Sequence, residues 1–560
     1  MTLRSAPSRW GANKGSFFPG LSLLRMLLAL VAGGAQAASM AWPWVSQSGF
    51  FSRLGLRTGQ PVWWLQLLAL GVLAWLLEGR RPQRGETGCW RQGALFGGLF
   101  GTAWMGGTVW WTFVAMHTYG GLPLLLAALA VLVLAGLLGL YYAAACGLFV
   151  VMAPASRAWA ALVFSLLWLL AELARGTWLT GFGWGAAGYA HVDGPLAELA
   201  PWLGVYGLCA VSAWLAMTGA QTLRPLFTAT VSDGPVWSGQ VASLFVAGLM
   251  LTLPLTLPLT LPQGATDASH SSGVLSVTLL QGNIPQDEKF ESGTGVPLAL
   301  QWYAEQLQNS RTALVIAPET AIPVLPQQLP ASYWAGLQQR FGSGQQAALI
   351  GTPMGDSQQG YTNSVLGLKP GQAQPWRYDK QHLVPFGEFI PPLFRWFTDM
   401  MNIPLGDFNR GALRQPPFVW QGQKLAANIC VEDLFGEELA QSFRDPAQAP
   451  TIFVNTSNLA WFGNSLAMDQ HLQIARMRAL EFGRPFVLAT NTGVTAIVDH
   501  RGRVVAALSP DRRAVLVGAV EGRTGVTPYA WWVARFGLWP FWLLAVAIVW
   551  VAARGRWQKR

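Results

Sequence analysis

Charged side chains are scarce in this sequence. Asp, Glu, Lys and Arg together make up 11% of its 560 residues, against about 25% in an average soluble protein. Apolar residue types account for 52%, and tryptophan alone occurs 29 times. This balance excludes a wholly soluble chain and indicates a membrane protein that carries a soluble part. The length exceeds what one core usually organises, so we expect two or more domains.

Motifs for nucleic acid, phosphate and metal binding are also missing. The sequence has no Gly-rich phosphate loop, no zinc-ligand cluster and no RNA-binding motif. Most of the net charge of +10 lies in short loops beside apolar runs, where basic residues set membrane topology. We therefore expect no nucleic acid partner.

Eight apolar runs approach the length of about 20 residues that a helix needs to cross a bilayer. They cover residues 22–44, 61–78, 93–115, 122–152, 158–174, 199–221, 239–262 and 536–553. The pattern predicts a membrane domain of seven transmembrane helices in 1–263. It also predicts a C-terminal transmembrane helix and cytoplasmic tail in 531–560, with the soluble domain in 264–530.

Basic residues predict the orientation of these helices. With the N-terminus in the cytoplasm, most basic clusters fall inside, and Arg53 and Arg57 are the exceptions. The inside clusters include Arg4, Arg9, Lys14, Arg25, Arg80, Arg81, Arg84, Arg91 and the tail from Arg554 to Arg560. The first run also resembles a signal peptide with a cleavage site at 35–37. Under either interpretation, residues 264–530 are external.

Residues 264–530 have a different pattern, in which short β-rich runs alternate with helical stretches. The runs are 274–280, 313–317, 347–352, 425–429, 451–455, 486–490 and 495–498, and the helical stretches are 297–310 and 466–482. This alternation predicts a layered α/β domain.

Cysteine is rare, with four residues in the chain, and Cys430 is the only one in the external domain. A thiol without a disulfide partner in an oxidising compartment is a candidate reactive group, although a buried structural cysteine fits the same count. Cys430 directly follows a strand-like run, and Glu319 and Lys380 follow two others. A carboxylate can accept the thiol proton, and an ammonium can favour a thiolate and stabilise an oxyanion.

Segments around these three residues resemble the nitrilase (carbon–nitrogen hydrolase) superfamily and, more narrowly, the bacterial apolipoprotein N-acyltransferases. The resemblance covers nearly the whole chain, and its most specific run is 380–388, Lys-Gln-His-Leu-Val-Pro-Phe-Gly-Glu. The other matching segments are Ala317-Pro318-Glu319-Thr320, Asn428-Ile429-Cys430-Val431-Glu432, Gln281-Gly282-Asn283-Ile284-Pro285-Gln286, Ala460-Trp461-Phe462-Gly463 and the stretch 475–481.

The resemblance implies a polytopic α-helical membrane domain of about eight spans and a nitrilase-like αββα sandwich in the periplasm of the bacterial inner membrane. It implies that Cys430 takes an acyl chain from a phospholipid, with phosphatidylethanolamine the expected donor. The resulting thioester passes the chain to the α-amine of the S-diacylglyceryl cysteine of an apolipoprotein. Because the acyl group comes directly from the lipid, the resemblance implies no metal and no diffusible cofactor. Glu319 is the expected general base and acid, and Lys380 with the Val431 N–H the expected oxyanion site.

Further site residues follow only from the resemblance. Glu388 and Glu432 match positions that orient the triad, Asn363 matches a supporting asparagine, and Phe290 and Trp461 match positions near the substrate. The sequence departs from the family at three positions. Val431 stands where an aromatic residue is common, Phe290 where Trp is common, and Leu459 where Asp is common.

Two other features allow alternatives. The apolar segment 386–408 predicts either a mobile lid that admits acyl chains or packing within the domain. Glu172 and Arg175 predict either an ion pair at an aromatic belt or a surface for the lipid headgroup.

Two other functions compete with acyl transfer. A membrane-tethered amidase or nitrilase would share the triad but use water as the acceptor, and eight spans are more than an anchor needs. The third hypothesis is a non-catalytic transporter or binding protein. Such proteins tend to have internal repeats and charges in mid-membrane, and this sequence has no repeat and few such charges.

Overall fold

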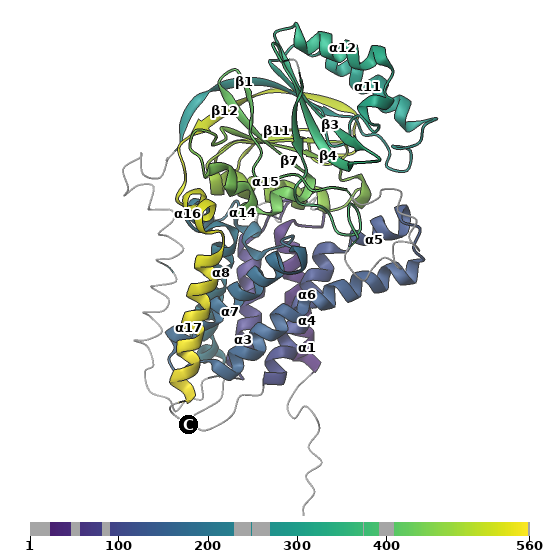
Figure 1. The fold of residues 1–560 in the computed structure, drawn as a ribbon. Coiled ribbons are helices and arrows are strands. Elements are labelled where there is room, and N and C mark those ends of the chain that lie inside the picture. The colour runs from purple at the N-terminus through teal and green to yellow at the C-terminus, as the bar shows by residue number, and fades with distance from the viewer. Residues whose placement is uncertain are drawn as a thin grey trace, which may run out of the picture.

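The structure, a computed structural model, describes residues 23–45, 56–80, 90–228, 248, 269–372, 374–390 and 408–557. Two stacked β-sheets form the upper half of the molecule, and a bundle of long helices forms the lower half (Figure 1). The predicted seventh apolar run, 239–262, lies outside the described residues except for Gly248, as does Cys89.

Each sheet has six strands. The first has the order β12-β1-β2-β3-β4-β5, and the second has the order β11-β10-β9-β8-β7-β6. The strands of the first sheet are β1 His270–Gln281, β2 Leu314–Ile316, β3 Ala347–Asp356, β4 Gly360–Leu368, β5 Trp376–Asp379 and β12 Ala514–Thr524. Those of the second are β6 Phe418–Trp420, β7 Gln423–Ile429, β8 Ile452–Ser457, β9 Phe486–Thr490, β10 Ala496–Val498 and β11 Val504–Ala507.

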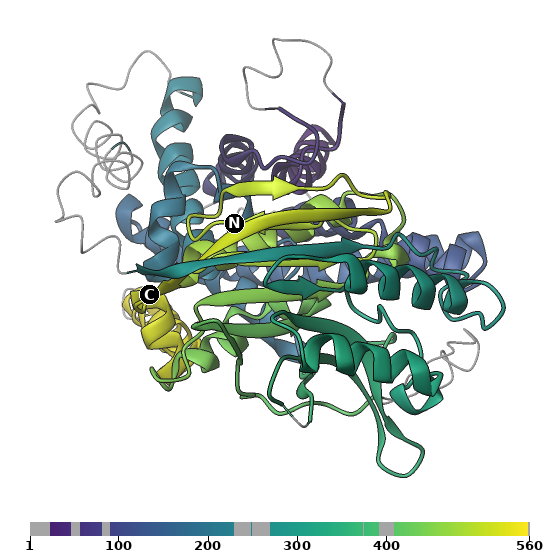
Figure 2. The same ribbon diagram turned by 90° about the horizontal axis from the view of Figure 1, so that it is seen from above.

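The sheets are the inner layers of an αββα sandwich. Helices α11 (Gly295–Asn309) and α12 (Ala331–Gly342) pack on the outer face of the first sheet through a separate apolar cluster (Figure 2). Helix α15 (Ala467–Phe482) lies on the opposite side, between the second sheet and the bundle (Figure 1). The parallel pairs β1–β2–β3 and β7–β8–β9 place the carboxyl ends of several strands at common edges. Those edges position the site described below.

The bundle contains six long helices among the described residues. They are α1 Leu23–Met40, α3 Trp63–Glu78, α4 Trp90–Val109, α6 Leu124–Met152, α7 Arg157–Thr177 and α8 Ala200–Thr228, and α17 (Trp539–Trp557) packs beside α7. Within the described ranges, four helices are long and apolar enough to span a membrane, or five if the bent pair α16 (Pro528–Phe536) and α17 is one span. The expected count of about eight spans is therefore not confirmed.

A stripe of glycines on α4 lies against helix α6. A Cβ on Gly97 would lie 2.4 Å from the Tyr142 carbonyl oxygen of α6, and one on Gly93 would lie 2.5 Å from that of Cys146. Gly101 meets α6 in the same way. The spacing of four residues brings two backbones together, as small residues do in membrane helix pairs.

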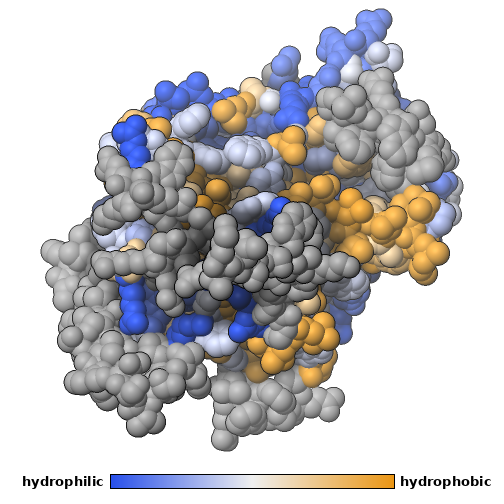
Figure 3. Space-filling view, turned by 90° about the horizontal axis from the view of Figure 1, so that it is seen from below, coloured by the Kyte–Doolittle hydropathy of each residue, from blue (hydrophilic) through white to orange (hydrophobic). Residues whose placement is uncertain are grey.

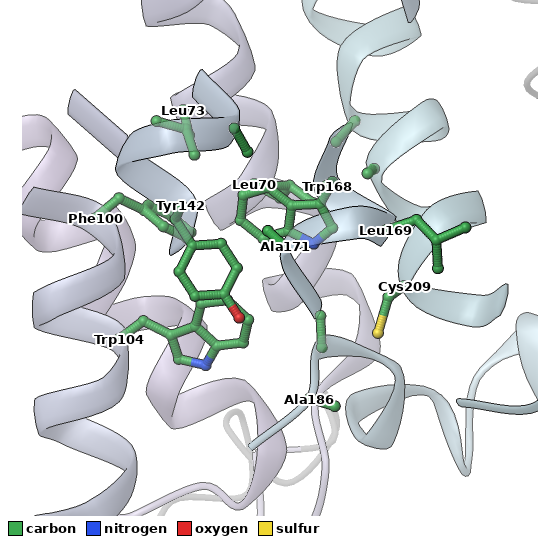
Figure 4. Packing of buried hydrophobic residues seen from close by; sticks show 14 of the residues in the cluster. Leu70, Leu73, Phe100, Trp104, Tyr142, Trp168, Leu169, Ala171, Ala186 and Cys209 are labelled. Carbon is green, nitrogen blue, oxygen red and sulfur yellow. The ribbon is translucent and has the colours of Figure 1, made fainter. Parts of the chain in front are cut away.

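Aromatic rings fill the centre of the bundle (Figure 4). The Trp104 and Trp168 rings are stacked with centroids 5.8 Å apart, and Tyr142 contacts both at 4.8 Å. Large apolar side chains also gather on the perimeter of the bundle (Figure 3). On α6 the exposed ones include Leu125 and Leu132. A helix that is apolar on both its packed and its exposed faces is suited to lipid.

Glu172 and Arg175 form an ion pair inside the bundle, with both side chains fully buried and 2.7 Å between Oε2 and Nη2. Arg175 also donates to the Tyr142 hydroxyl and to the carbonyl oxygens of Phe182 and Trp184. The predicted ion pair is confirmed. A lipid-headgroup surface is excluded at this position, because the guanidinium is buried and donates to carbonyl oxygens of the loop that follows α7.

Helix α15 joins the two halves of the molecule. The Gln470 side-chain oxygen accepts from the indole N–H of Trp111 and of Trp184, at 3.0 and 2.8 Å, and its amide donates to Thr108. Further along, Glu481 accepts from the backbone N–H of Val205 at 2.6 Å. These bonds are buried, so the sandwich has a defined position on the bundle.

Candidate active site

Glu319, Lys380 and Cys430 each follow the end of a strand, as the sequence predicts. Glu319 comes three residues after β2, Lys380 directly follows β5, and Cys430 directly follows β7. The structure brings all three together although they come from two different sheets. The Lys380 Nζ lies 3.5 Å from Glu319 Oε1, and the Cys430 thiol interacts electrostatically with both groups. All three side chains are buried.

The Glu319 carboxylate is held by two neutral donors. The Asn363 side-chain amide on β4 donates to Oε1 at 2.7 Å, and the backbone N–H of Asn458 donates to Oε2 at 2.8 Å. The turn that carries Glu319 is strained at Thr320, whose φ is +51°. A Cβ on Gly351 would lie 2.3 Å from the Pro318 carbonyl oxygen and 2.7 Å from the Glu319 Cα, so this turn requires a glycine opposite it.

Lys380 lies between two carboxylates. It donates to Glu388 Oε1 at 2.9 Å, which also accepts from Asn363 at 2.9 Å, and Glu388 Oε2 accepts from the backbone N–H of Val384. Burial opposes the charge of Lys380, but Glu388 and Glu319 raise its pKa above the usual value. The side chain is therefore a fixed ammonium.

Cys430 has a left-handed backbone conformation, with φ of +55°, between β7 and a 3-10 turn over Cys430–Leu434. The Asn455 side chain donates to the Cys430 carbonyl oxygen at 2.9 Å. Two residues on, the Glu432 carboxylate accepts from the backbone N–H of Ile429, Gln381 and His382 and from the Tyr378 hydroxyl. Glu432 thus ties the cysteine turn to the segment that carries Lys380. A bulky side chain in such a conformation is costly, and it is retained where the surroundings fix it.

As expected from the sequence, the Lys380 ammonium favours the thiolate, because it lowers the pKa of the Cys430 thiol. Burial and the neighbouring Glu319 raise the pKa of the Cys430 thiol well above its usual value, and Lys380 only partly offsets them. The thiol is therefore protonated at neutral pH. A protonated thiol can act as a nucleophile only if a base removes its proton, and Glu319 is a carboxylate that interacts electrostatically with it.

The expected substrate contacts lie at different depths. Phe290 is 38% exposed. Trp461 is partly buried, and its ring makes an edge-to-face contact with the ring of Tyr119 in the bundle, with the two centroids 5.8 Å apart. Val431 is partly buried and packs against both the bundle and the sandwich core. Of the predicted lid, residues 391–407 lie outside the described part, and Phe386 at its start is exposed with φ of +63°.

Sequence reasoning missed four residues of the network. Asn458, Asn455, Gln286 and Lys289 are all buried within it. Gln286 stands in a segment that matched the family, but no role was assigned to it. Asn455 and Asn458 flank the end of β8, where strand-end position was an available signal.

Comparison with known proteins defines first a class of domain. Residues 276–529 match the carbon-nitrogen hydrolase family, and residues 48–218 match the apolipoprotein N-acyltransferase N-terminal domain. A solved structure of the nitrilase-superfamily protein Nit3 from Saccharomyces cerevisiae aligns with 45% of this chain and 91% of its own, at 15% identity and a TM-score of 0.33. The two family matches, rather than this structural likeness, define residues 276–529 as a carbon-nitrogen hydrolase domain that follows an apolipoprotein N-acyltransferase N-terminal domain.

Full-length relatives narrow this class. The apolipoprotein N-acyltransferase of Verminephrobacter eiseniae is 56% identical over 521 residues, covering 91% of this chain and 92% of the relative. That of Ralstonia nicotianae is 44% identical over 470 residues, covering 83% and 85%. That of Neisseria meningitidis serogroup A is 36% identical, covering 84% and 89%. The chain belongs to the apolipoprotein N-acyltransferase family and is a membrane-bound enzyme.

Proposed function

We propose that this protein transfers a fatty acyl chain from a phospholipid to the α-amino group of the S-diacylglyceryl cysteine of apolipoproteins, through a thioester on Cys430. The observation that carries the proposal is the buried thiol in a strained turn beside the Glu319–Lys380 ion pair. A thiol without metal or cofactor can form an acyl intermediate if a base removes its proton and donors receive the oxyanion.

In the first half-reaction, Glu319 accepts the Cys430 proton while the sulfur attacks the ester carbonyl carbon. Negative charge develops on the carbonyl oxygen, where Lys380 Nζ and the backbone N–H of Val431 stabilise it. When the ester C–O bond breaks, Glu319 returns the proton to the departing oxygen of the lysophospholipid. Burial of all three side chains favours these reaction steps, because fixed charges interact more strongly away from water.

In the second half-reaction, the α-amine of the diacylated cysteine attacks the thioester carbonyl, and Glu319 takes the proton that the nitrogen loses. The same donors hold the oxyanion. Breaking the C–S bond leaves an amide on the acceptor, and the proton returns from Glu319 to the sulfur. Asn363, Glu388 and Glu432 keep the triad in place through the hydrogen bonds described above.

The membrane body suits two lipid substrates. We propose a membrane domain in 1–263, a catalytic domain in 264–530 and a last span with a cytoplasmic tail in 531–560. We place the enzyme in the bacterial inner membrane with the catalytic domain in the periplasm, and phosphatidylethanolamine is the proposed donor. Phe290 and Trp461 are proposed to contact the acyl chains.

The test is acylation of the purified enzyme by a phospholipid with a labelled acyl chain, without acceptor, followed by intact mass and peptide mapping. We expect one hydroxylamine-sensitive acyl group on Cys430, which a diacylated lipopeptide removes. Cys430→Ser should abolish the adduct. Cys146→Ala is the matched control, because that thiol lies buried in the bundle away from the triad. No adduct, with hydrolysis of small amides instead, would favour the amidase.

Donor and topology have separate tests. Vesicles that differ only in headgroup should acylate Cys430 fastest with phosphatidylethanolamine, and equal rates for all headgroups would contradict that choice. A fluorescent-protein fusion after residue 560 should fluoresce in the cytoplasm, and an alkaline phosphatase fusion at that point should be inactive. An inactive fluorescent protein and an active phosphatase would contradict the proposed orientation.

A further inference from the structure

The loop between β1 and α11 has its polar and apolar side chains on unexpected sides. Along residues 285–290, Gln286 and Lys289 are buried, whereas Phe290 is exposed. Asp287 and Glu288 are exposed as well. Lysine is among the residues least often fully buried without a partner, and its burial costs free energy that a hydrogen-bonded neighbour must offset.

The buried ammonium contacts the backbone of Glu319, the proposed base, rather than its carboxylate. Lys289 Nζ donates to the backbone carbonyl oxygen of Glu319 at 3.1 Å. The next residue, Thr320, has the left-handed φ of +51° noted above. The lysine therefore holds the peptide unit at which the chain turns after β2.

The same loop holds the carboxylate end of that residue. The Gln286 side-chain oxygen accepts from the Asn458 side-chain amide at 2.7 Å, and the Asn458 backbone N–H donates to Glu319 Oε2. Glu319 is thus fixed at its carbonyl by Lys289 and at its carboxylate through Gln286 and Asn458. Both contacts come from one short loop that the triad does not include.

We propose that Lys289 is a positioning residue for acyl transfer, whose ammonium fixes the Glu319 peptide so that the carboxylate points at the Cys430 thiol. The inference rests on the proposed function, because it concerns the base of the same reaction. Loss of the ammonium lets the turn at Thr320 relax and moves the carboxylate. A misplacement of about 1 Å in a catalytic group costs roughly a hundredfold in rate.

The charge of this lysine changes within an accessible pH range. Burial lowers its pKa from 10.5 to about 8, although the facing groups Glu319 and Cys430 raise it. Asp287 and Glu288 of its own loop point outward, and Lys380 is held by Glu319 and Glu388. Acylation should therefore slow above about pH 8. Between pH 8 and 10.5 the unfolded chain binds the proton that the folded protein has lost, so this group stabilises the fold as pH rises. Loss of the Lys289 proton therefore does not itself destabilise the fold.

The experiment measures the acylation half-reaction of the full-length enzyme between pH 6 and 10, with labelled phosphatidylethanolamine in vesicles. At pH 7 we expect Lys289→Met to lower the maximal rate by about 10- to 100-fold with little change in the half-saturating lipid fraction. Its rate should no longer fall near pH 8. Lys289→Arg, which stays charged, should recover most of the rate, and its rate should also not fall near pH 8. The control is Lys424→Met, which removes another lysine that donates to a backbone carbonyl, at the far end of β7.

Several results would overturn the inference. Wild-type acylation that stays constant to pH 10 would do so, as would a Lys289→Met enzyme within twofold of wild type. A change confined to the half-saturating lipid fraction would indicate a headgroup contact instead. If the methionine variant does not fold, Lys289→Gln replaces it and is judged by the same rate and pH criteria. Lys289→Arg remains the charged comparison. No adduct on wild-type Cys430 would overturn the proposed function and this inference together, whereas a normal adduct with unaffected lysine variants overturns the inference alone.

Discussion

Glu388→Gln tests the arrangement of charges at the site most directly. The carboxylate accepts three hydrogen bonds of 2.9 Å, from Lys380 Nζ and Asn363 Nδ2 at Oε1 and from the Val384 N–H at Oε2. Glutamine has the same shape but presents an NH2 group on one side. In one orientation the NH2 faces Lys380 and Asn363, and in the other it faces Val384. Either way a donor meets a donor.

The expected loss follows from the burial of these groups. Removing one partner of a buried ion pair costs about 3–5 kcal/mol. Lys380 then has only Glu319 as a counter-charge, at 3.5 Å, and we expect it to move toward the base and away from the oxyanion position. If about 3–4 kcal/mol of this loss is expressed in the transition state, acylation of Cys430 slows by roughly 10²–10³-fold.

Two assays check this expectation. Single-turnover acylation from labelled phospholipid gives the rate, and thermal unfolding in detergent gives the stability, which we expect to fall by roughly 10 °C in midpoint. Glu521→Gln is the matched control, because this glutamate on β12 is about half exposed and lies 3.8 Å from Arg523. An E388Q enzyme that acylates within twofold of wild type would refute the claim that Glu388 holds Lys380 in its working position.

Three further predictions concern the surroundings of the site. Gly351→Ala should slow acylation at least tenfold, because the added Cβ would lie 2.7 Å from the Glu319 Cα; Gly342→Ala, which meets nothing within 4 Å, should leave single-turnover acylation unchanged. Gln470→Leu leaves two buried indole N–H groups unpaired and should destabilise the junction of α15 and the bundle by about 2–4 kcal/mol, measured by thermal unfolding. Burial raises the pKa of Glu437 from 4.5 to about 7, so its contribution to stability is lost as pH rises through that window, by up to about 3 kcal/mol. Glu437→Gln should therefore raise the unfolding midpoint at pH 8 but not at pH 5, and an equal shift at both values would contradict the burial argument.

Local pattern was sufficient for much of the sandwich. All seven predicted strands coincide with observed ones, and the helical stretches 297–310 and 466–482 correspond to α11 and α15. The strand-like run before Lys380 corresponds to β5, whereas strands β4, β6, β11 and β12 and helix α12 were not predicted. Strand β12 is mostly exposed or half-buried, so its composition carries no strong apolar period. It is a strand because it pairs with β1 along eleven positions, from His270–Thr524 to Gln281–Ala514.

The membrane part was less predictable in its details. Composition marked the apolar runs, but glycines lower the hydropathy of α4, and only its close contact with α6 explains them. For the charges at 172 and 175, the sequence left an ion pair and a headgroup surface as alternatives, and the structure shows the ion pair. Their complete burial depends on Tyr142 of α6 and on the carbonyl groups of the following loop. Such contacts join residues that are distant in sequence.

The sequence by itself determined the candidates for the reactive groups, since a thiol, a carboxylate and an amine each follow a strand-like run within family motifs. Only the tertiary structure decided how these groups work. Whether Cys430 is a thiol or a thiolate depends on burial and on the distances to Glu319 and Lys380, and both arise when two sheets meet. The buried Lys289 was missed for the same reason. Its neighbours in sequence are exposed, and only the position of the Glu319 peptide explains why its ammonium points inward.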